Sequence, residues 1–135
     1  MEEKKSLKNY FDKIYVLNYI EGKGRRDAMI KQLEHFGLLK DVEFHYGMPF
    51  GKIKAMAPKI QEIANMMPFN VGRINGIGCS FNHYSAIKTA YETGCNTVLI
   101  IEDDICLRND LELIYEYFDN VPKDWDYLYL SPIMS

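Results

Sequence analysis

The feature that most constrains this chain is an uninterrupted apolar segment, residues 97–101 (Thr-Val-Leu-Ile-Ile), which runs directly into three acidic residues. The segment lacks the alternation of apolar and polar residues that a half-exposed strand requires, and this is typical of a central parallel strand covered on both faces. Covering both faces takes helices on each side of the sheet. We therefore expect an α/β fold: a Rossmann-like, mostly parallel sheet with helices on both faces.

The rest of the sequence alternates between strand and helix patterns, as an α/β fold requires. In chain order the expected elements are strand 13–18, helix 25–36, strand 42–46, helix 58–67, helix 76–93, strand 97–101, helix 111–118 and strand 126–130. A glycine-rich loop is expected at 69–78. Gly37 should end the first helix, and Pro58 should occupy the first turn of the second. Asn109 or Asp110 should cap the last helix.

Composition excludes several classes of protein. A length of 135 residues fits about one domain, and 16 basic against 19 acidic residues give a net charge of −3, which provides no overall attraction for nucleic acid. No apolar run approaches the roughly 20 residues needed to cross a bilayer, and the acidic N-terminus lacks the pattern of a secretory signal, so we expect a cytoplasmic location. Cys79, Cys95 and Cys106 have no C-x-x-C spacing, which favours reduced thiols.

The acidic residues that follow the apolar strand are the sharpest candidate site. Ligands of Rossmann-like sheets bind at the carboxyl ends of the strands, where Asn18 and the acidic triplet should both lie. If the chain stays extended, Glu102 and Asp104 point to one side and Asp103 to the other. Two carboxylates could then converge on a cation, and oxygen ligands suit Mg²⁺ or Mn²⁺. The alternative is a solvated acidic loop or a cap for the next helix.

Two helix starts carry further candidates. Arg25 and Arg26 begin the first predicted helix, where guanidinium groups and free backbone N–H groups can hold phosphate oxygens, although solvated surface arginines fit equally well. His83 is expected in the first or second turn of the helix that begins between Gly76 and Cys79. Cys79 and His83 stand four residues apart, but two ligands do not make a zinc site. A packed, hydrogen-bonded His83 is therefore the favoured interpretation.

Three short blocks stand in a particular order along the chain. A strand ends at Asn18, and Arg25 follows seven residues later. Residues 77–79, Ile-Gly-Cys, precede His83, and residues 98–104 end in Glu-Asp-Asp. In this order the blocks resemble glycosyltransferase family 25, the lipopolysaccharide-type glycosyltransferases.

The resemblance covers about residues 13–130. This chain departs from the family pattern at five positions, which are Tyr19, Glu21, Asn75, Gly76 and Asn82. The resemblance implies a GT-A type sheet. It also implies a domain longer than this chain, so residues 1–135 are expected to form a single domain, the sugar-nucleotide-binding half, with weak or no transfer activity alone.

The resemblance further implies a metal-dependent enzyme that transfers a hexose, galactose or glucose, from a UDP-sugar to a hydroxyl of a surface glycan such as lipopolysaccharide. The donor site would comprise Asn18, Arg25, His83 and Asp103. Glu102 and Asp104 would bind Mn²⁺ or Mg²⁺. No residue is assigned as the general base.

The expected partners are the UDP-sugar donor and a glycan or lipid-linked glycan acceptor. Peripheral association with the inner face of the membrane and formation of a homo-oligomer stay open. The alternative to an enzyme is a non-catalytic, glycosyltransferase-like module that binds a nucleotide or a partner. A phosphate-accepting receiver domain fits less well, because the first strand ends in Asn18 and not in an acidic pair.

Overall fold

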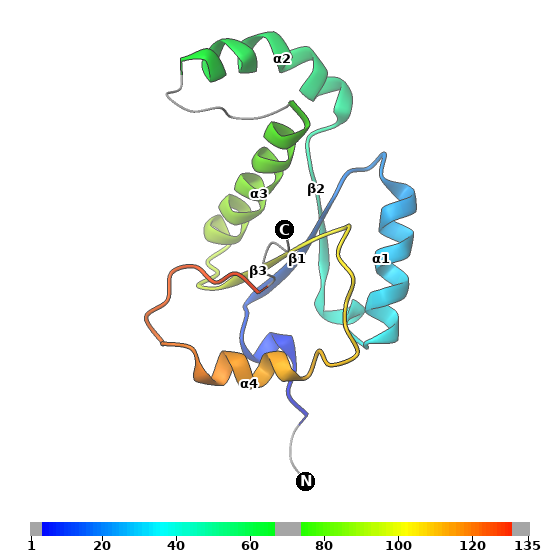
Figure 1. The fold of residues 1–135 in the computed structure, drawn as a ribbon, viewed down its shortest axis with the longest axis vertical. Coiled ribbons are helices and arrows are strands. Elements are labelled where there is room, and N and C mark those ends of the chain that lie inside the picture. The colour runs from blue at the N-terminus through cyan, green and yellow to red at the C-terminus, as the bar shows by residue number, and fades with distance from the viewer. Residues whose placement is uncertain (1–3, 67–73, 131–135) are drawn as a thin grey trace.

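The computed structural model describes residues 4–66 and 74–130, and they form one parallel sheet with helices on both of its faces (Figure 1). The described sheet contains β1 (Lys13–Asn18), β2 (Glu43–Tyr46) and β3 (Val98–Glu102), in the order β2-β1-β3. The described helices are α1 (Lys23–His35), α2 (Phe50–Asn65), α3 (Ile74–Glu92) and α4 (Leu113–Asn120), with short 3₁₀ turns at Leu7–Asn9 and Leu39–Asp41. The predicted α/β, Rossmann-like fold is confirmed.

The central strand of the described sheet is β1, whose residues from Ile14 to Asn18 are all buried. Val16 pairs with Phe44 of β2 on one side and with Ile101 of β3 on the other. The prediction that 97–101 is the central strand is therefore wrong. Within the described sheet β3 is an edge strand, and of its five residues Ile101 alone is buried, with 8% of its surface exposed. Two apolar strands of similar length look alike in sequence, so composition could not give their order.

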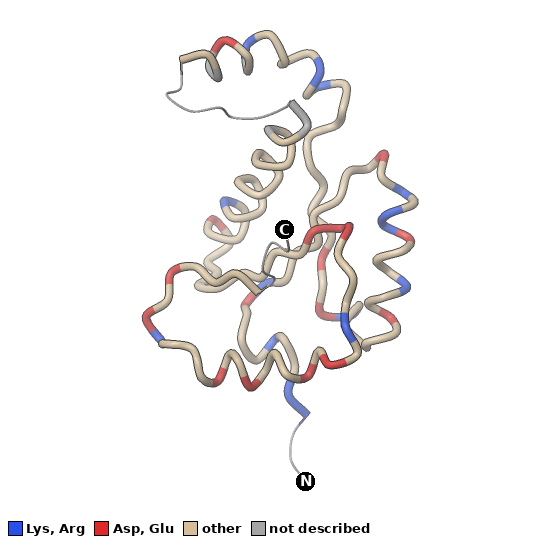
Figure 2. Tube along the Cα trace, in the orientation of Figure 1, with Lys and Arg blue, Asp and Glu red and all other residues tan. Residues whose placement is uncertain are grey.

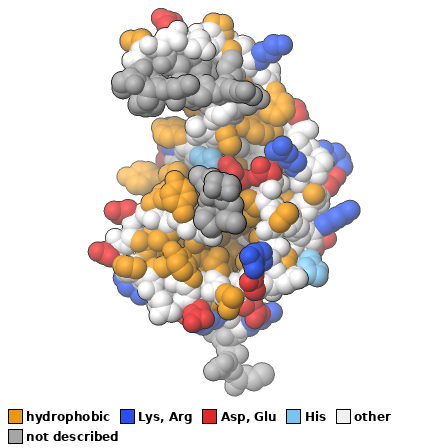
Figure 3. Space-filling model, in the orientation of Figure 1, with side chains coloured by type: hydrophobic (Ala, Val, Ile, Leu, Met, Phe, Trp, Pro, Cys, Tyr) orange, Lys and Arg blue, Asp and Glu red, His pale blue; other side chains and the backbone are white. Residues whose placement is uncertain are grey.

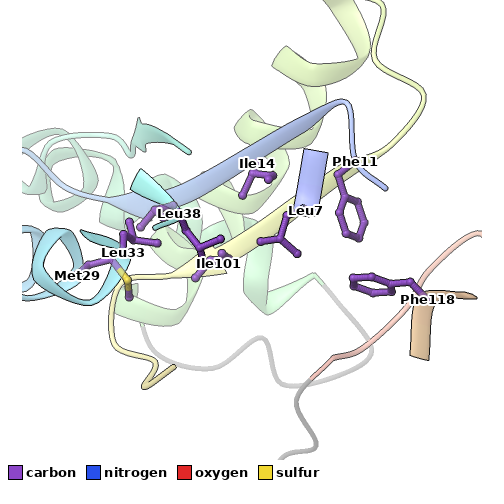
Figure 4. Close-up of a cluster of buried hydrophobic side chains, with 9 residues drawn as sticks. Leu7, Phe11, Ile14, Met29, Leu33, Leu38, Ile101 and Phe118 are labelled. Atoms are coloured by element: carbon purple, nitrogen blue, oxygen red, sulfur yellow. The ribbon is translucent and has the colours of Figure 1, made fainter. Parts of the chain in front are cut away.

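Alternate residues of β1 belong to two apolar layers, one on each face of the sheet. Ile14 and Val16 belong to a cluster that includes Met29 and Leu33 of α1 and Phe118 of α4 (Figure 4). The intervening residues of β1 pack with Ala86 and Ala90 of α3 on the opposite face. Helices therefore cover both faces of β1, as predicted. None of the described helices combines the length and apolarity that a membrane span requires.

The predicted strand at 126–130 is wrong. This segment is described, and it forms no ladder with the sheet. Tyr127 and Tyr129 are 64% and 76% exposed, and their rings contact each other at a centroid distance of 4.8 Å. Leu130 packs against the core. The alternating tyrosines of this segment thus contact each other, and the segment does not pair with a strand of the described sheet.

Helices α1, α2 and α3 all begin earlier than the sequence predicts, and α1 begins at Lys23, two residues before the predicted start at 25. Phe50 begins α2, and its backbone N–H donates to Glu21 Oε1 at 3.1 Å, so Pro58 lies inside the helix and not in its first turn. Helix α3 begins at Ile74, ahead of the predicted start at 76–79, so the predicted loop is wrong for 74–78, while residues 67–73 lie outside the described residues. The start of α2 depends on a carboxylate distant in sequence, which local patterns do not reveal.

Of the two predicted helix-end signals, the one after α1 is confirmed and the one before α4 is wrong. Gly37 has φ of +69°, a conformation that glycine adopts readily, and it follows α1 as predicted. The predicted cap of α4 is wrong, because Glu112 precedes the helix without a side-chain cap. Asp110 instead accepts hydrogen bonds from Arg108.

Gly47, at the end of β2, leaves no room for a side chain. A Cβ atom there would lie 2.6 Å from Tyr19 Cε1 and 2.9 Å from Asn82 Nδ2. Its N–H donates to the backbone oxygen of Asn18 at 2.8 Å, so the backbone cannot easily move away. We expect Gly47→Ala to lower the free energy of unfolding by about 1–3 kcal/mol, the usual cost of overpacking, as measured by urea denaturation.

Gly24 is the matched control for this prediction. It lies in the first turn of α1, and nothing stands within 4 Å of a Cβ atom built there. Because alanine favours a helix over glycine by up to about 1 kcal/mol, Gly24→Ala should leave stability unchanged or raise it. Equal effects of the two substitutions would show that Gly47 is not tightly packed.

Candidate functional site

The carboxyl edge of the sheet brings together residues that are far apart in sequence. Asn18 ends β1, and Asp103 follows β3, so the parallel pairing of the two strands places them side by side. Figure 2 shows the acidic segment after β3 on the same side of the sheet as the basic start of α1. Figure 3 shows acidic, basic and histidine side chains reaching the surface near the middle of this face.

The buried side chain of Asn18 makes hydrogen bonds to three other residues at this edge. Its amide nitrogen donates to Asp103 Oδ2 at 2.7 Å and to the backbone oxygen of Gly22 at 3.2 Å. Its amide oxygen accepts a hydrogen bond from Arg26 Nη1 at 2.8 Å. The side chain is fully buried, and both ends of the amide are occupied by protein groups. Asn18 therefore acts here as a positioning residue, which holds the acidic turn and the loop before α1 in place.

The two neighbouring arginines of α1 have different environments. Arg26 donates to Asn18 and to the backbone oxygens of Tyr19 and Ile20, and its guanidinium lies 5.6 Å from the centroid of the Tyr46 ring. Arg25 is 67% exposed and has one contact of 3.5 Å, with Asp103 Oδ1. Arg26 is thus a structural residue, while Arg25 is available to an incoming anion. The residue pattern at the helix start singled out the pair, and the family resemblance implied a donor-site role for Arg25 alone.

The acidic triplet does not continue the strand. Glu102 is the last residue of β3, and Asp103 and Asp104 form a turn, so the predicted extended geometry is wrong. The three carboxylates separate as a result: Asp103 faces Asn18, and Glu102 faces His83. Asp104 is exposed, and no described residue donates a hydrogen bond to it.

This arrangement bears on the predicted Mn²⁺ or Mg²⁺. Mg²⁺ is usually held by one or two carboxylates together with substrate phosphates and water. Asp104, exposed and unengaged by the described residues, fits such a role. Glu102 fits it less well as arranged here, because its Oε1 atom accepts hydrogen bonds from two other side chains.

A second cluster joins α3 to the end of β3. His83 Nε2 lies 3.0 Å from Glu102 Oε1, and Cys79 Sγ lies 3.5 Å from the same oxygen. The hydrogen bond from His83 holds the pKa of Glu102 below its usual value, while partial desolvation of the sulfur and the nearby carboxylate raise the pKa of the Cys79 thiol. Because α3 begins at Ile74, His83 lies deeper in the helix than the predicted first or second turn. His83 is hydrogen-bonded, as its favoured interpretation predicted.

The cluster contains a third potential ligand that sequence reasoning did not add to the Cys79–His83 pair. The ligand atoms of Cys79, His83 and Glu102 lie within 4.8 Å of one another. In the described part of the chain this is the one group of three such residues at that spacing. The i, i+4 spacing on one helix and an acidic residue at the end of a neighbouring strand were both visible in the sequence, but their proximity depends on how α3 packs.

A parallel Rossmann-like sheet with a basic helix start and an acidic turn at its carboxyl edge is typical of nucleotide-binding α/β proteins. The family model described as "Glycosyltransferase family 25 (LPS biosynthesis protein)" matches residues 11–134. The chain therefore belongs to glycosyltransferase family 25, and the resemblance noted in the sequence is confirmed.

Curated relatives include procollagen galactosyltransferase 2 of Homo sapiens and its counterpart in Mus musculus. Each is 28% identical to this chain over 132 residues, an alignment that covers 90% of this chain and 21% of the relative. The chain thus spans about a fifth of the length of these relatives.

Proposed function

We propose that this chain binds a UDP-sugar and transfers its hexose, galactose or glucose, to a hydroxyl of a glycan such as lipopolysaccharide. The observation that carries the proposal is the Asn18–Asp103–Arg25 arrangement at the carboxyl edge of the sheet, in a chain that belongs to glycosyltransferase family 25. The printed name of its curated relatives, which are galactosyltransferases, supports galactose as the sugar. The acceptor is a glycan or lipid-linked glycan in this proposal.

The start of α1 is suited to the donor diphosphate. Gly22 precedes the helix without a side-chain cap, so the first backbone N–H groups of α1 are available to an anion. Arg25 is exposed and weakly held, so it can exchange its 3.5 Å contact with Asp103 for a paired contact with phosphate oxygens. A diphosphate bound here would lie beside the acidic turn.

The two aspartates of the acidic turn have different proposed roles. Asp103 is held by Asn18 and its side chain is 11% exposed, so it presents a carboxylate of fixed orientation that can accept a hydrogen bond from a donor-sugar hydroxyl. Asp104 would hold Mn²⁺ or Mg²⁺, which when bound neutralises the charge that develops on the diphosphate leaving group. His83 contacts Glu102, the residue just before the acidic turn, and its hydrogen bond is not to Asp103.

We expect UDP and UDP-hexoses to bind tightly in the presence of Mn²⁺ and weakly in EDTA, because carboxylates without a cation repel the diphosphate. Isothermal titration calorimetry of this chain with UDP, UDP-galactose and UDP-glucose measures the difference. Equal binding with Mn²⁺ and with EDTA would contradict the role of the cation. No binding in either condition would contradict the proposed donor site.

Transfer is separated from binding by measuring UDP release from UDP-galactose and UDP-glucose, with and without glycan acceptors. Acceptor-dependent release supports the transferase. Binding without release supports the alternative, a non-catalytic glycosyltransferase-like module. Arg108→Ala is a suitable control, since Arg108 is 82% exposed and pairs with Asp110, two residues away.

A further inference from the structure

We propose that Cys79, His83 and Glu102 form a binding site for one zinc ion. The site is separate from the cation position proposed at Asp104, and it does not depend on the proposed donor specificity. Its three ligand atoms lie within 4.8 Å of one another.

The ligands come from two regular elements that are packed together. Cys79 and His83 are four residues apart on α3, so they lie on the same face of the helix. Glu102 is the last residue of β3. Ala86 and Ala90, further along α3, are buried against the sheet. Sites built on packed helices and strands hold their geometry better than sites on loops.

Two of the three distances between ligand atoms are close to those of a tetrahedral zinc site. Zinc bonds of about 2.3 Å to sulfur and about 2.0–2.1 Å to nitrogen and oxygen place the ligand atoms roughly 3.3–3.5 Å apart at tetrahedral angles. Glu102 Oε1 lies 3.5 Å from Cys79 Sγ and 3.0 Å from His83 Nε2. The third pair, Cys79 Sγ and His83 Nε2, lies within 4.8 Å, so side-chain adjustments are needed for the three atoms to bind one zinc ion.

The donor set selects zinc over the harder cations. Thiolate and imidazole ligands suit Zn²⁺, whereas Mg²⁺ and Mn²⁺ prefer oxygen. One thiolate and one carboxylate neutralise the charge of the ion. Binding releases the thiol proton of Cys79 to solvent and requires the His83 ring proton to reside on Nδ1, so that Nε2 offers its lone pair.

Three protein ligands leave the fourth position of the zinc ion open to water or to a ligand group. Cys79 is exposed, and the side chains of His83 and Glu102 are 36% and 46% exposed, so solvent reaches this position. The site would also fasten α3 to the end of β3, directly beside the acidic turn.

The competing explanation is a metal-free hydrogen-bond cluster, in which the Cys79 S–H and the His83 N–H both donate to Glu102 Oε1. In that explanation the chain does not bind a thiophilic metal at this cluster. The two explanations therefore differ in a property that can be measured without any sugar nucleotide.

The test is titration of the reduced, metal-free chain with Co²⁺, followed by competition with Zn²⁺. We expect one Co²⁺ per chain, a thiolate-to-cobalt charge-transfer band, and loss of that band when Zn²⁺ replaces Co²⁺. Cys79→Ser should abolish the band. Glu102→Gln should weaken Co²⁺ binding by at least about 10-fold, because loss of a residue that merely supports a metal ligand already costs about that much affinity.

Cys106→Ser is the matched control, because Cys106 is an exposed free cysteine outside the cluster. It should leave the band and the affinity unchanged. A wild-type chain that gives no charge-transfer band overturns the proposal, as does a band that survives Cys79→Ser. Circular dichroism of each variant without metal confirms that a lost band does not reflect a lost fold.

Discussion

Replacing Asn18 with leucine should lower the free energy of unfolding by about 2–4 kcal/mol, although leucine is apolar and similar in size. The side chain of Asn18 is fully buried and makes three hydrogen bonds. Leucine would leave the Asp103 carboxylate, the Gly22 carbonyl and one Arg26 contact without their partner. Of these, Asp103 is the most costly, because it is a charged group with an 11% exposed side chain.

Urea denaturation of the wild type and the variant measures this loss. Asn120→Ala is the control, because Asn120 is exposed and donates one hydrogen bond, to the backbone oxygen of Glu116. That substitution should change stability by less than about 0.5 kcal/mol. If Asn18→Leu cost no more than the control, the buried network would not stabilise the edge of the sheet, and the fixed orientation of Asp103 would lose its basis.

The sequence located the secondary structure well where a segment carried its own signals. The predicted strand 13–18 has the bounds of β1, because its four inner residues are β-branched, aromatic or aliphatic and polar residues stand at both ends. Helix α1 ends where Gly37 predicted, since a glycine with positive φ acts within one turn. In both cases the information lies within a few residues of the feature that it determines.

The errors arose where the structure depends on residues distant in sequence. The start of α2 involves a hydrogen bond from Phe50 to Glu21, and the order of the strands reflects pairing across the whole sheet. The segment at 126–130 has the alternation of a strand but no partner strand among the described residues. Periodicity shows that a segment can form a strand, but not whether a neighbour is available.

The candidate site shows the same division. The sequence placed Asn18 and the acidic triplet at one edge of the sheet, because carboxyl ends of parallel strands meet there. It could not show that Glu102 turns toward α3, because that contact joins residues 19 positions apart. It also could not show that the Asn18 amide is fully hydrogen-bonded within the protein, because its bond to Asp103 spans 85 positions. Residue type and edge were predictable, whereas the direction of each side chain was not.

Asp104→Asn should weaken Mn²⁺-dependent binding of UDP by roughly 30-fold to 4,000-fold while the chain stays folded. Removing one partner of a close charge pair costs about 2–5 kcal/mol of binding energy, and each 1.4 kcal/mol is about a factor of ten in affinity. Asp104 is exposed and follows two other acidic residues, so its neutralisation relieves like-charge repulsion and should not destabilise the fold. Calorimetric titration of UDP in Mn²⁺ measures the loss, and a thermal melt monitors folding.

Asp124→Asn is the control that separates a local effect from a change in net charge. Asp124 is exposed, lies after α4, and loses the same unit of charge when substituted. We expect it to bind UDP as the wild type does, because charges on the surface separated by more than about 10 Å are largely screened in 0.1 M salt. If both variants lost affinity equally, the diphosphate would be responding to the overall charge of the chain. If Asp104→Asn instead lowered the melting temperature sharply, Asp104 would be a structural residue, and the cation would have to be bound elsewhere.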